Sequence, residues 1–118
     1  MELVHAYGMQ SRTFYISRST DFLDNILACD ANARCCWVIS SFKSIASVRN
    51  TVVSHGYVGI LPQYACVTQD LTKAMHDMGF IVAVWTANSE KVMRDMINKE
   101  VDYIATNYVD VCVDLLGG

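Results

Sequence analysis

The chain has 118 residues and a formal net charge of −3, and 53% of its residues are hydrophobic against 18% charged. This composition excludes a disordered chain, and the scattered Lys and Arg residues argue against a nucleic-acid partner. The length allows one domain, over residues 1–118. No apolar stretch approaches the ~20 residues of a membrane span, and the first residues lack the pattern of a secretion signal. We therefore predict a cytoplasmic protein without a membrane span.

The five cysteines indicate reduced thiols rather than disulfides. Their number is odd, and Cys35 and Cys36 are adjacent, so that a strand would direct them to opposite faces. No two cysteines have the CxxC spacing of a structural zinc site. We expect mostly buried, reduced cysteines and no zinc.

Short apolar runs alternate along the chain with segments of helical spacing, a pattern typical of repeated strand–helix units around a parallel sheet. Thr20 or Asp21 is expected to cap the first helix, and Gly56 and Gly79 are expected to end the second and third. In chain order the pattern predicts strand 13–17, helix 21–29, strand 34–39, helix 43–54, strand 58–61, helix 68–78, strand 81–86, helix 89–98 and strand 102–106.

Two motifs in the last third of the chain resemble the closing strands of glycerophosphodiester phosphodiesterases. In the first, a strand runs into Trp85, Thr86 and Asn88, and in the second Val101 and Asp102 begin a strand. The second motif continues with Ile104, Thr106 and Asn107. The upstream segments resemble the preceding strands and helices of the same family. The resemblance implies an α/β fold, a partial TIM barrel of β/α repeats with parallel strands, and the C-terminal half only, because a complete barrel needs about 250 residues.

The sequence departs from the family pattern at two positions near its end. Glu100 stands where the family prefers Gly before the Val-Asp pair, and Val109 stands where a Pro usually follows the last strand. A third departure is Arg18, at a position that is usually apolar or aromatic in the family. The departures indicate a diverged copy.

The resemblance implies a phosphoric diester hydrolase that uses a divalent cation, Mg²⁺ or Ca²⁺, and two histidines. In the family these groups lie in His-Arg-Gly, Glu-x-Asp and His-Asp motifs on the first strands of the barrel and in a later Glu-x-Lys, all before the region that this chain covers. We therefore expect no catalytic residue, no metal ligand and no cofactor in this chain. The three histidines, His5, His55 and His76, are expected in helices or at helix ends, and the aspartates on solvated faces.

One wall of a substrate pocket remains within the chain. Trp85 ends its strand where, by the resemblance, the family's tryptophan faces the barrel mouth and packs against the glycerol part of the substrate. Ser17 and Asn107 also fall at strand ends and are further substrate-binding candidates. The alternatives are that Trp85 belongs to the core, as Trp37 does, and that Ser17 and Asn107 cap helices.

A half-barrel leaves strands 13–17 and 102–106 as edges with unpaired backbone groups, and something must cover them. The cover could be the missing N-terminal half, a second copy of the chain, or residues 1–9 folded over the opening. Two functions follow: part of a glycerophosphodiester phosphodiesterase in lipid metabolism, inactive without its other half, or a non-catalytic remnant that dimerises or binds a polyol phosphate. A flavodoxin-like binding domain is a third reading, but a Gly-rich phosphate loop does not follow the first strand.

Overall fold

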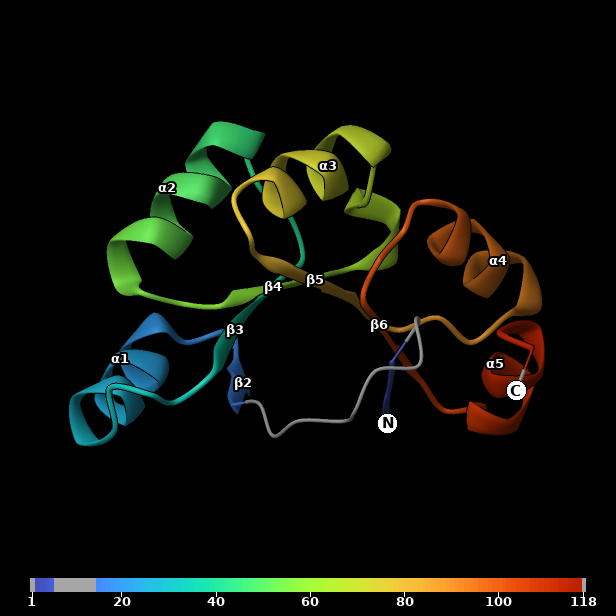
Figure 1. The fold of residues 1–118 in the computed structure, drawn as a ribbon, viewed down its shortest axis with the longest axis horizontal. Helices are drawn as coiled ribbons and strands as arrows, with labels where there is room; N and C mark the ends of the chain where they lie inside the picture. Colours follow the sequence, from blue (N-terminus) through green and yellow to red (C-terminus); the bar gives the residue numbers. More distant parts are fainter. Residues whose placement is uncertain (1, 6–14, 118) are drawn as a thin grey trace.

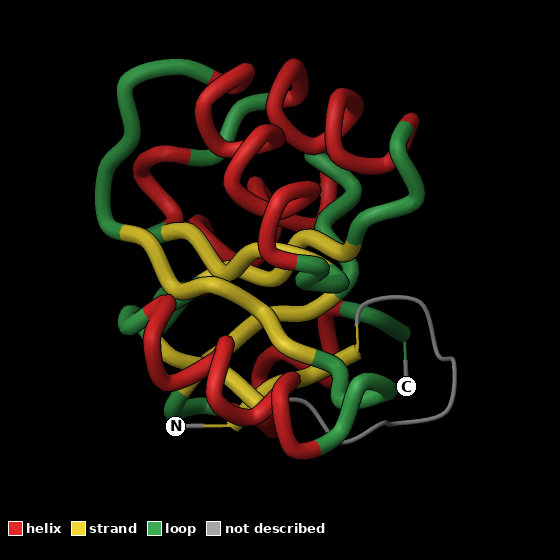
Figure 2. Tube along the Cα trace, turned by 90° about the vertical axis from the view of Figure 1, so that its left-hand side faces the viewer, coloured by secondary structure: helices red, strands yellow, loops and turns green. Residues whose placement is uncertain are grey.

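The computed structural model describes residues 2–5 and 15–117 and shows a curved sheet with its helices along the outer side (Figure 1). The strands are β1 (Glu2–His5), β2 (Tyr15–Ser17), β3 (Cys35–Ile39), β4 (Gly59–Pro62), β5 (Ile81–Val84) and β6 (Tyr103–Thr106). The helices are α1 (Thr20–Cys29), α2 (Ile45–His55), the short 3₁₀ helix η1 (Tyr64–Cys66), α3 (Gln69–Asp77), α4 (Glu90–Asn98) and α5 (Val109–Leu115). Seen from the side, the strands lie in the middle of the molecule (Figure 2).

The strand order is β1-β6-β5-β4-β3-β2, and β2 to β6 are parallel to their neighbours. Each parallel strand is followed by a helix, so the chain forms repeated β/α units that curl into half of a barrel. The predicted fold class, a partial TIM barrel, is confirmed by this arrangement. Residues 13 and 14 of the first predicted strand lie outside the described residues.

The expected edge at β6 is covered by part of residues 1–9, one of the three covers that the sequence left open. β1 pairs with β6 in antiparallel register, with His5 opposite Tyr103. His5 therefore lies in a strand, and its predicted place at a helix or helix end is wrong. Pairing with β1 satisfies backbone groups of β6 that would otherwise face solvent. Within the described part of the chain, β2 pairs with β3 alone and is the remaining parallel edge.

Side chains of successive strand residues point to opposite faces of the sheet and form two apolar clusters. The larger cluster lies between the sheet and the helices and contains residues such as Val82, Val84 and Ile104. The smaller cluster consists of Leu61, Ala83 and Tyr103, against which Val38, Ile81 and Trp85 pack. Because its residues alternate with those of the larger cluster, the smaller one lies on the concave, inner face.

The described cysteines are free, as expected, and three of them, Cys35, Cys36 and Cys112, are buried. Cys35 belongs to the outer cluster while its neighbour Cys36 does not, in agreement with the predicted alternation. Cys29 is exposed. The thiols therefore contribute to packing without cross-linking the chain.

Three consecutive helices end on a residue in the left-handed conformation, which directs the chain back into the sheet. Gly56 (φ 77°) follows α2 and Gly79 (φ 80°) follows α3, as the sequence predicts. The corresponding residue after α4 is Glu100, at φ 64°. Its amide donates to the Ile97 carbonyl at 3.0 Å, as the Gly79 amide does to His76 at 2.9 Å. An L-residue is disfavoured in this conformation, which explains physically why the family prefers Gly there.

The starts of α1 to α4 are fixed by side chains that accept hydrogen bonds from first-turn amides, whereas α5 has no such cap. The cap of α1 is Ser19, whose Oγ accepts from the Phe22 amide at 3.2 Å, so the predicted cap by Thr20 or Asp21 is wrong. Val109 is the first residue of α5, a position that favours Pro because the amide there needs no helical partner. Among the helices of the described residues, none combines the length and hydrophobicity of a membrane span.

Gly59 marks a close approach between β4 and β5. A Cβ atom at this position would overlap the carbonyl group of Ile81 on the neighbouring strand. Only glycine fits here without moving the backbone of β5. Gly59 lies opposite Ile81 in the parallel register, at the amino ends of the two central strands.

Candidate functional site

The carboxyl ends of the five parallel strands lie at one end of the half-barrel, where barrel enzymes carry their active sites. Five loops follow these strands, at residues 18–19, 40–44, 63–68, 85–89 and 107–108, and together they are called the mouth. Arg18 and Lys43 are the only charged residues in these loops, and no Asp or Glu occurs in them. The mouth is therefore cationic in a chain whose net charge is −3.

Trp85 joins the mouth to the inner apolar cluster. Its backbone forms a parallel bridge with Gln63 and accepts a hydrogen bond from the Tyr64 amide at 2.8 Å. Its indole Nε1 donates to the Ile39 carbonyl at 3.3 Å, and its ring packs against the cluster of Leu61, Ala83 and Tyr103. The side chain is only partly buried. Trp85 is therefore held in one orientation with part of its ring available at the mouth.

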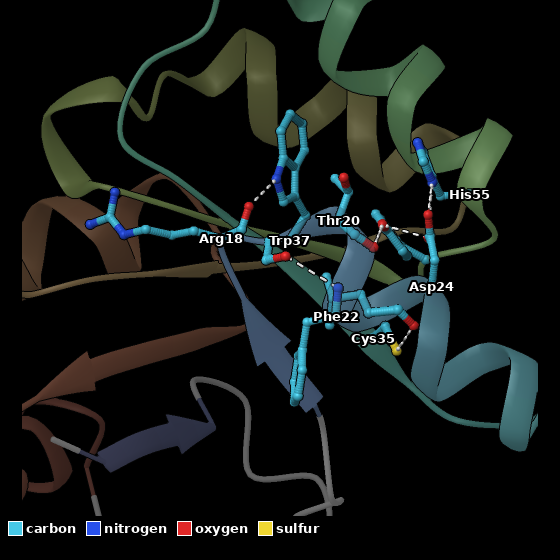
Figure 3. Close-up of polar contacts among 10 residues, drawn as sticks. Arg18, Thr20, Phe22, Asp24, Cys35, Trp37 and His55 are labelled. Atoms are coloured by element: carbon cyan, nitrogen blue, oxygen red, sulfur yellow. Dashed lines mark hydrogen bonds and ion pairs between the residues drawn. The ribbon is translucent and has the colours of Figure 1, made fainter.

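Arg18 lies over the Trp85 ring, with its guanidinium carbon 4.9 Å from the ring centroid. Its Nη1 also donates to Ser40 Oγ at 3.2 Å, and its backbone carbonyl accepts from Trp37 Nε1 at 3.3 Å (Figure 3). None of the ion pairs found among the described residues includes Arg18. An exposed guanidinium stacked on an aromatic ring keeps most of its five donors free for an oxyanion.

Arg18 was expected only as a departure from the family pattern, and neither Arg18 nor Ser40 was predicted to belong to the site. The available signal was the position of Arg18 directly after a strand, combined with the lack of acidic residues in all five loops. Its contact with Trp85 crosses from β2 to β5 and could not be inferred without the sheet order.

Ser17 and Asn107 lie at the mouth, as predicted, and their observed bonds shape the loops. Ser17 Oγ accepts from the Ser19 amide at 3.0 Å and so forms the turn that leads into α1. Asn107 is exposed, and its amide donates to Asn88 Oδ1 at 2.9 Å. Neither contact joins these residues to Trp85. Their role in substrate binding, like that of Trp85, remains a prediction.

The two recognisable motifs hold β5 and β6 together at both ends. At the mouth, Asn88 Oδ1 accepts from the Asn107 amide and from Thr106 Oγ1 at 3.4 Å. At the other end, Asp102 Oδ2 accepts from the Val82 amide at 2.8 Å and lies 2.8 Å from His76 Nε2. Much of the motif sequence therefore has a structural role.

Two short segments match the letters of the family's catalytic motifs but lie away from the mouth. His76 and Asp77 read His-Asp, yet both belong to the last turn of α3. Glu100, Val101 and Asp102 read Glu-x-Asp, yet they lie before β6, at its amino end. His55 is the last residue of α2, and His5 lies opposite the first residue of β6. All three imidazoles therefore lie at the end of the sheet opposite the mouth.

The residues of the mouth do not fit the divalent cation that the family implies. Mg²⁺ and Ca²⁺ prefer carboxylate oxygens, and the five loops contain none. Within residues 2–5 and 15–117, no three His, Cys, Asp or Glu side chains are grouped so that they could share a metal ion. No step through a metal is therefore derived for this chain.

A polar cluster links α1 to the end of α2, away from the mouth. Asp24 lies 2.9 Å from His55 Nδ1 and accepts from the Tyr57 hydroxyl at 2.9 Å, and the two rings stack (Figure 3). Desolvation acts to raise the pKa of Asp24, but hydrogen bonds from Tyr57 and His55 and the His55 charge outweigh it and lower that pKa. Burial and the bond to Asp24 raise the pKa of Tyr57.

The fold and the position of its mouth define half of a barrel of the TIM type. The sequence model of the glycerophosphoryl diester phosphodiesterase family matches residues 14–111. The chain therefore belongs to this family, and the predicted resemblance is confirmed. A comparison with curated proteins gives no match.

Solved structures of phosphodiesterases share the fold. The chain is similar to a glycerophosphodiester phosphodiesterase from Parabacteroides distasonis, with 23% identity and a TM-score of 0.77 over 90% of this chain and 43% of that one. It also resembles one from Thermotoga maritima, with 21% identity and a TM-score of 0.70 over 86% of this chain and 46% of that one. A phosphodiesterase from Oleispira antarctica, solved with its product sn-glycerol 3-phosphate, has 14% identity and a TM-score of 0.77. That match covers 86% of this chain and 41% of the Oleispira chain. The chain thus spans less than half the length of these structures.

Proposed function

We propose that the chain forms the C-terminal half of a glycerophosphodiester phosphodiesterase barrel and that its mouth holds the phosphate-bearing part of a glycerophosphodiester. The observation that carries the proposal is the guanidinium of Arg18, stacked 4.9 Å above Trp85 at the strand ends. Arg18 offers donors to a phosphate oxygen, and the uncovered part of the Trp85 ring offers an apolar surface to glycerol carbons. Ser17 and Asn107 are proposed to contribute polar groups at the same mouth.

Hydrolysis is proposed to require a complementary half. Cleavage of a phosphodiester needs a group that protonates the leaving alkoxide and a stabiliser for charge on the phosphoryl oxygens, which in this family involves a divalent cation. The mouth supplies a guanidinium but neither an imidazole nor a carboxylate. Mg²⁺ or Ca²⁺, if used, would be bound by the complementary half, and the chain alone would be inactive.

The place for that half is the open side of the sheet. Tyr15 and Ile16 on β2 are 44% and 40% exposed, although strand residues of this kind are normally covered. An edge strand with exposed apolar side chains favours pairing with further strands. The same edge would also serve the second candidate, a non-catalytic remnant in which two copies pair through β2 and bind a polyol phosphate.

Hydrolysis and oligomeric state test the proposal together. The purified chain is assayed with glycerophosphoglycerol and with bis(p-nitrophenyl) phosphate, in Mg²⁺ or Ca²⁺ and with a chelator as control. We expect no metal-dependent turnover. Turnover that persists in the chain but is lost in His55→Ala or His76→Ala would contradict the proposal, because it would show a catalytic site outside the mouth.

Sedimentation separates the two candidates. A monomer that pairs only when a complementary half-barrel is added supports the phosphodiesterase half. A stable homodimer that dissociates in Ile16→Lys, without turnover, supports the non-catalytic remnant. The free cysteines are consistent with a reducing, cytoplasmic location, which we also propose.

A further inference from the structure

The mouth combines positive charge with a complete lack of carboxylates. Its loops contain Arg18 and Lys43 but none of the 12 acidic residues of the chain. The nearest acidic residues in the sequence lie in the first turns of the helices that follow the loops, where they complement the positive helix ends. All four are exposed: Asp21, Asp70, Glu90 and Asp110. The loops themselves therefore present cations to a bound ligand.

A ligand with a cationic group needs either a carboxylate or the open face of an aromatic ring. The loops of the mouth contain no carboxylate and four aromatic residues. Phe42 and Tyr64 pack against the outer cluster, and Tyr108 is exposed. Trp85 is therefore the one that packs against the inner cluster at the strand ends. One face of that ring is already occupied by the Arg18 guanidinium, 4.9 Å from its centroid. A trimethylammonium group approaching Trp85 would therefore meet a positive charge where it would otherwise find an attractive π surface.

Arg18 has contacts within the protein that do not involve a ligand. Its Nη1 donates to Ser40 Oγ, and its backbone carbonyl is anchored by the Trp37 indole. The side chain extends away from Asp24 and His55, so that pair does not neutralise it (Figure 3). A guanidinium remains charged at all physiological pH values, so the repulsion is permanent.

We propose that Arg18 is a specificity-determining residue that makes the mouth select glycerophosphodiesters with uncharged polyol head groups and reject those with cationic head groups. This inference rests on the proposed function, because it concerns the same mouth. The phosphate is common to all such substrates, so the discrimination comes from the head group alone. Lys43 adds positive charge at the mouth without a contact to Trp85.

The test measures binding of two diesters that share glycerol and phosphate, glycerophosphoinositol and glycerophosphocholine, by isothermal titration calorimetry. We expect the unaltered chain to bind glycerophosphoinositol about 10-fold more tightly than glycerophosphocholine. Arg18→Gln should reduce this ratio to about 2-fold or less, whereas Arg18→Lys, which keeps the charge, should retain most of it. Lys43→Gln is the matched control and should leave the ratio within about 2-fold of the original. Thermal unfolding of each variant checks that the fold is intact.

The outcomes separate the two proposals. Binding of both diesters with a ratio that Arg18→Gln leaves unchanged overturns the selectivity and leaves the proposed function standing. An equal loss of selectivity in Lys43→Gln also overturns it, because the effect would then be one of general charge. Failure of the unaltered chain to bind either diester, or sn-glycerol 3-phosphate, overturns the proposed function and with it the selectivity.

Discussion

Replacing Glu100 with glycine should stabilise the protein. Glu100 has φ 64° and is exposed, and it fills the position that Gly79 fills after the preceding helix. The left-handed conformation costs an L-residue about 1–2 kcal/mol, and the greater chain entropy of unfolded glycine offsets about 0.5–1 kcal/mol of the gain. The net expectation is about 0.5–1 kcal/mol in the free energy of unfolding, or about 2–4 °C in Tm for a domain of this size. Urea denaturation followed by circular dichroism measures it.

Two further variants isolate the backbone effect. Glu100→Ala removes the carboxylate but keeps the Cβ atom, so it should not reproduce the stabilisation. Gly79 has φ 80°, and nothing lies within 4 Å of an added Cβ. Gly79→Ala should destabilise the protein by about 1 kcal/mol, because it places an L-residue in the left-handed conformation. If Glu100→Gly were no more stable than Glu100→Ala, the account of the helix end after α4 would be refuted.

Three other predictions test the packing and electrostatics. Gly59→Ala should lower the free energy of unfolding by about 2–3 kcal/mol, because its Cβ overlaps the backbone of β5, and an unchanged urea midpoint would refute this. Because the pKa of Asp24 is lowered in the folded protein, its contribution to stability is present above its unfolded pKa and is lost as the pH falls below about 4. Asp24→Asn should therefore flatten the decline in Tm between about pH 5 and 3, and Tyr57→Phe should flatten it partly. If Tm of Asp24→Asn declined as steeply as that of the unaltered chain, the account of this cluster would be contradicted. In native protein at pH 8, maleimide should modify the exposed Cys29. It should not modify Cys36, whose pKa burial raises to about 12. An early reaction at Cys36, detected by peptide mapping, would contradict this.

Local patterns were sufficient to predict the five parallel strands and the four helices between them, because apolar periodicity reports which face of an element is buried. Where the structure describes them, the predicted boundaries differ from the observed ones by no more than two residues. The family motifs then selected a barrel over other parallel sheets. Gly56 and Gly79 were correctly placed because a left-handed helix end has a clear residue preference.

The errors concern contacts that the local sequence does not encode. Residues 1–9 were considered as a cover, but β1 was not predicted as a strand. Its pairing with β6 joins the two ends of the chain, and four residues without a partner carry a weak strand signal. Ser19 was missed as a cap because Thr20 and Asp21 beside it are equally suitable by type. The stacking of Arg18 on Trp85 depends on the curvature of the sheet, so the most informative pair at the mouth emerged only with the structure.

The central claim is that the mouth of this half-barrel binds the phosphate-bearing part of a glycerophosphodiester. The most direct measurement is a titration of ¹⁵N-labelled protein with sn-glycerol 3-phosphate, followed through the backbone amides and the Trp85 indole signal. We expect saturable shifts at Trp85, Arg18 and Asn107, with the amides of Gly56 and Gly79 at the opposite end unchanged. Shifts confined to the opposite end, or no saturable shift at the mouth, would contradict the account.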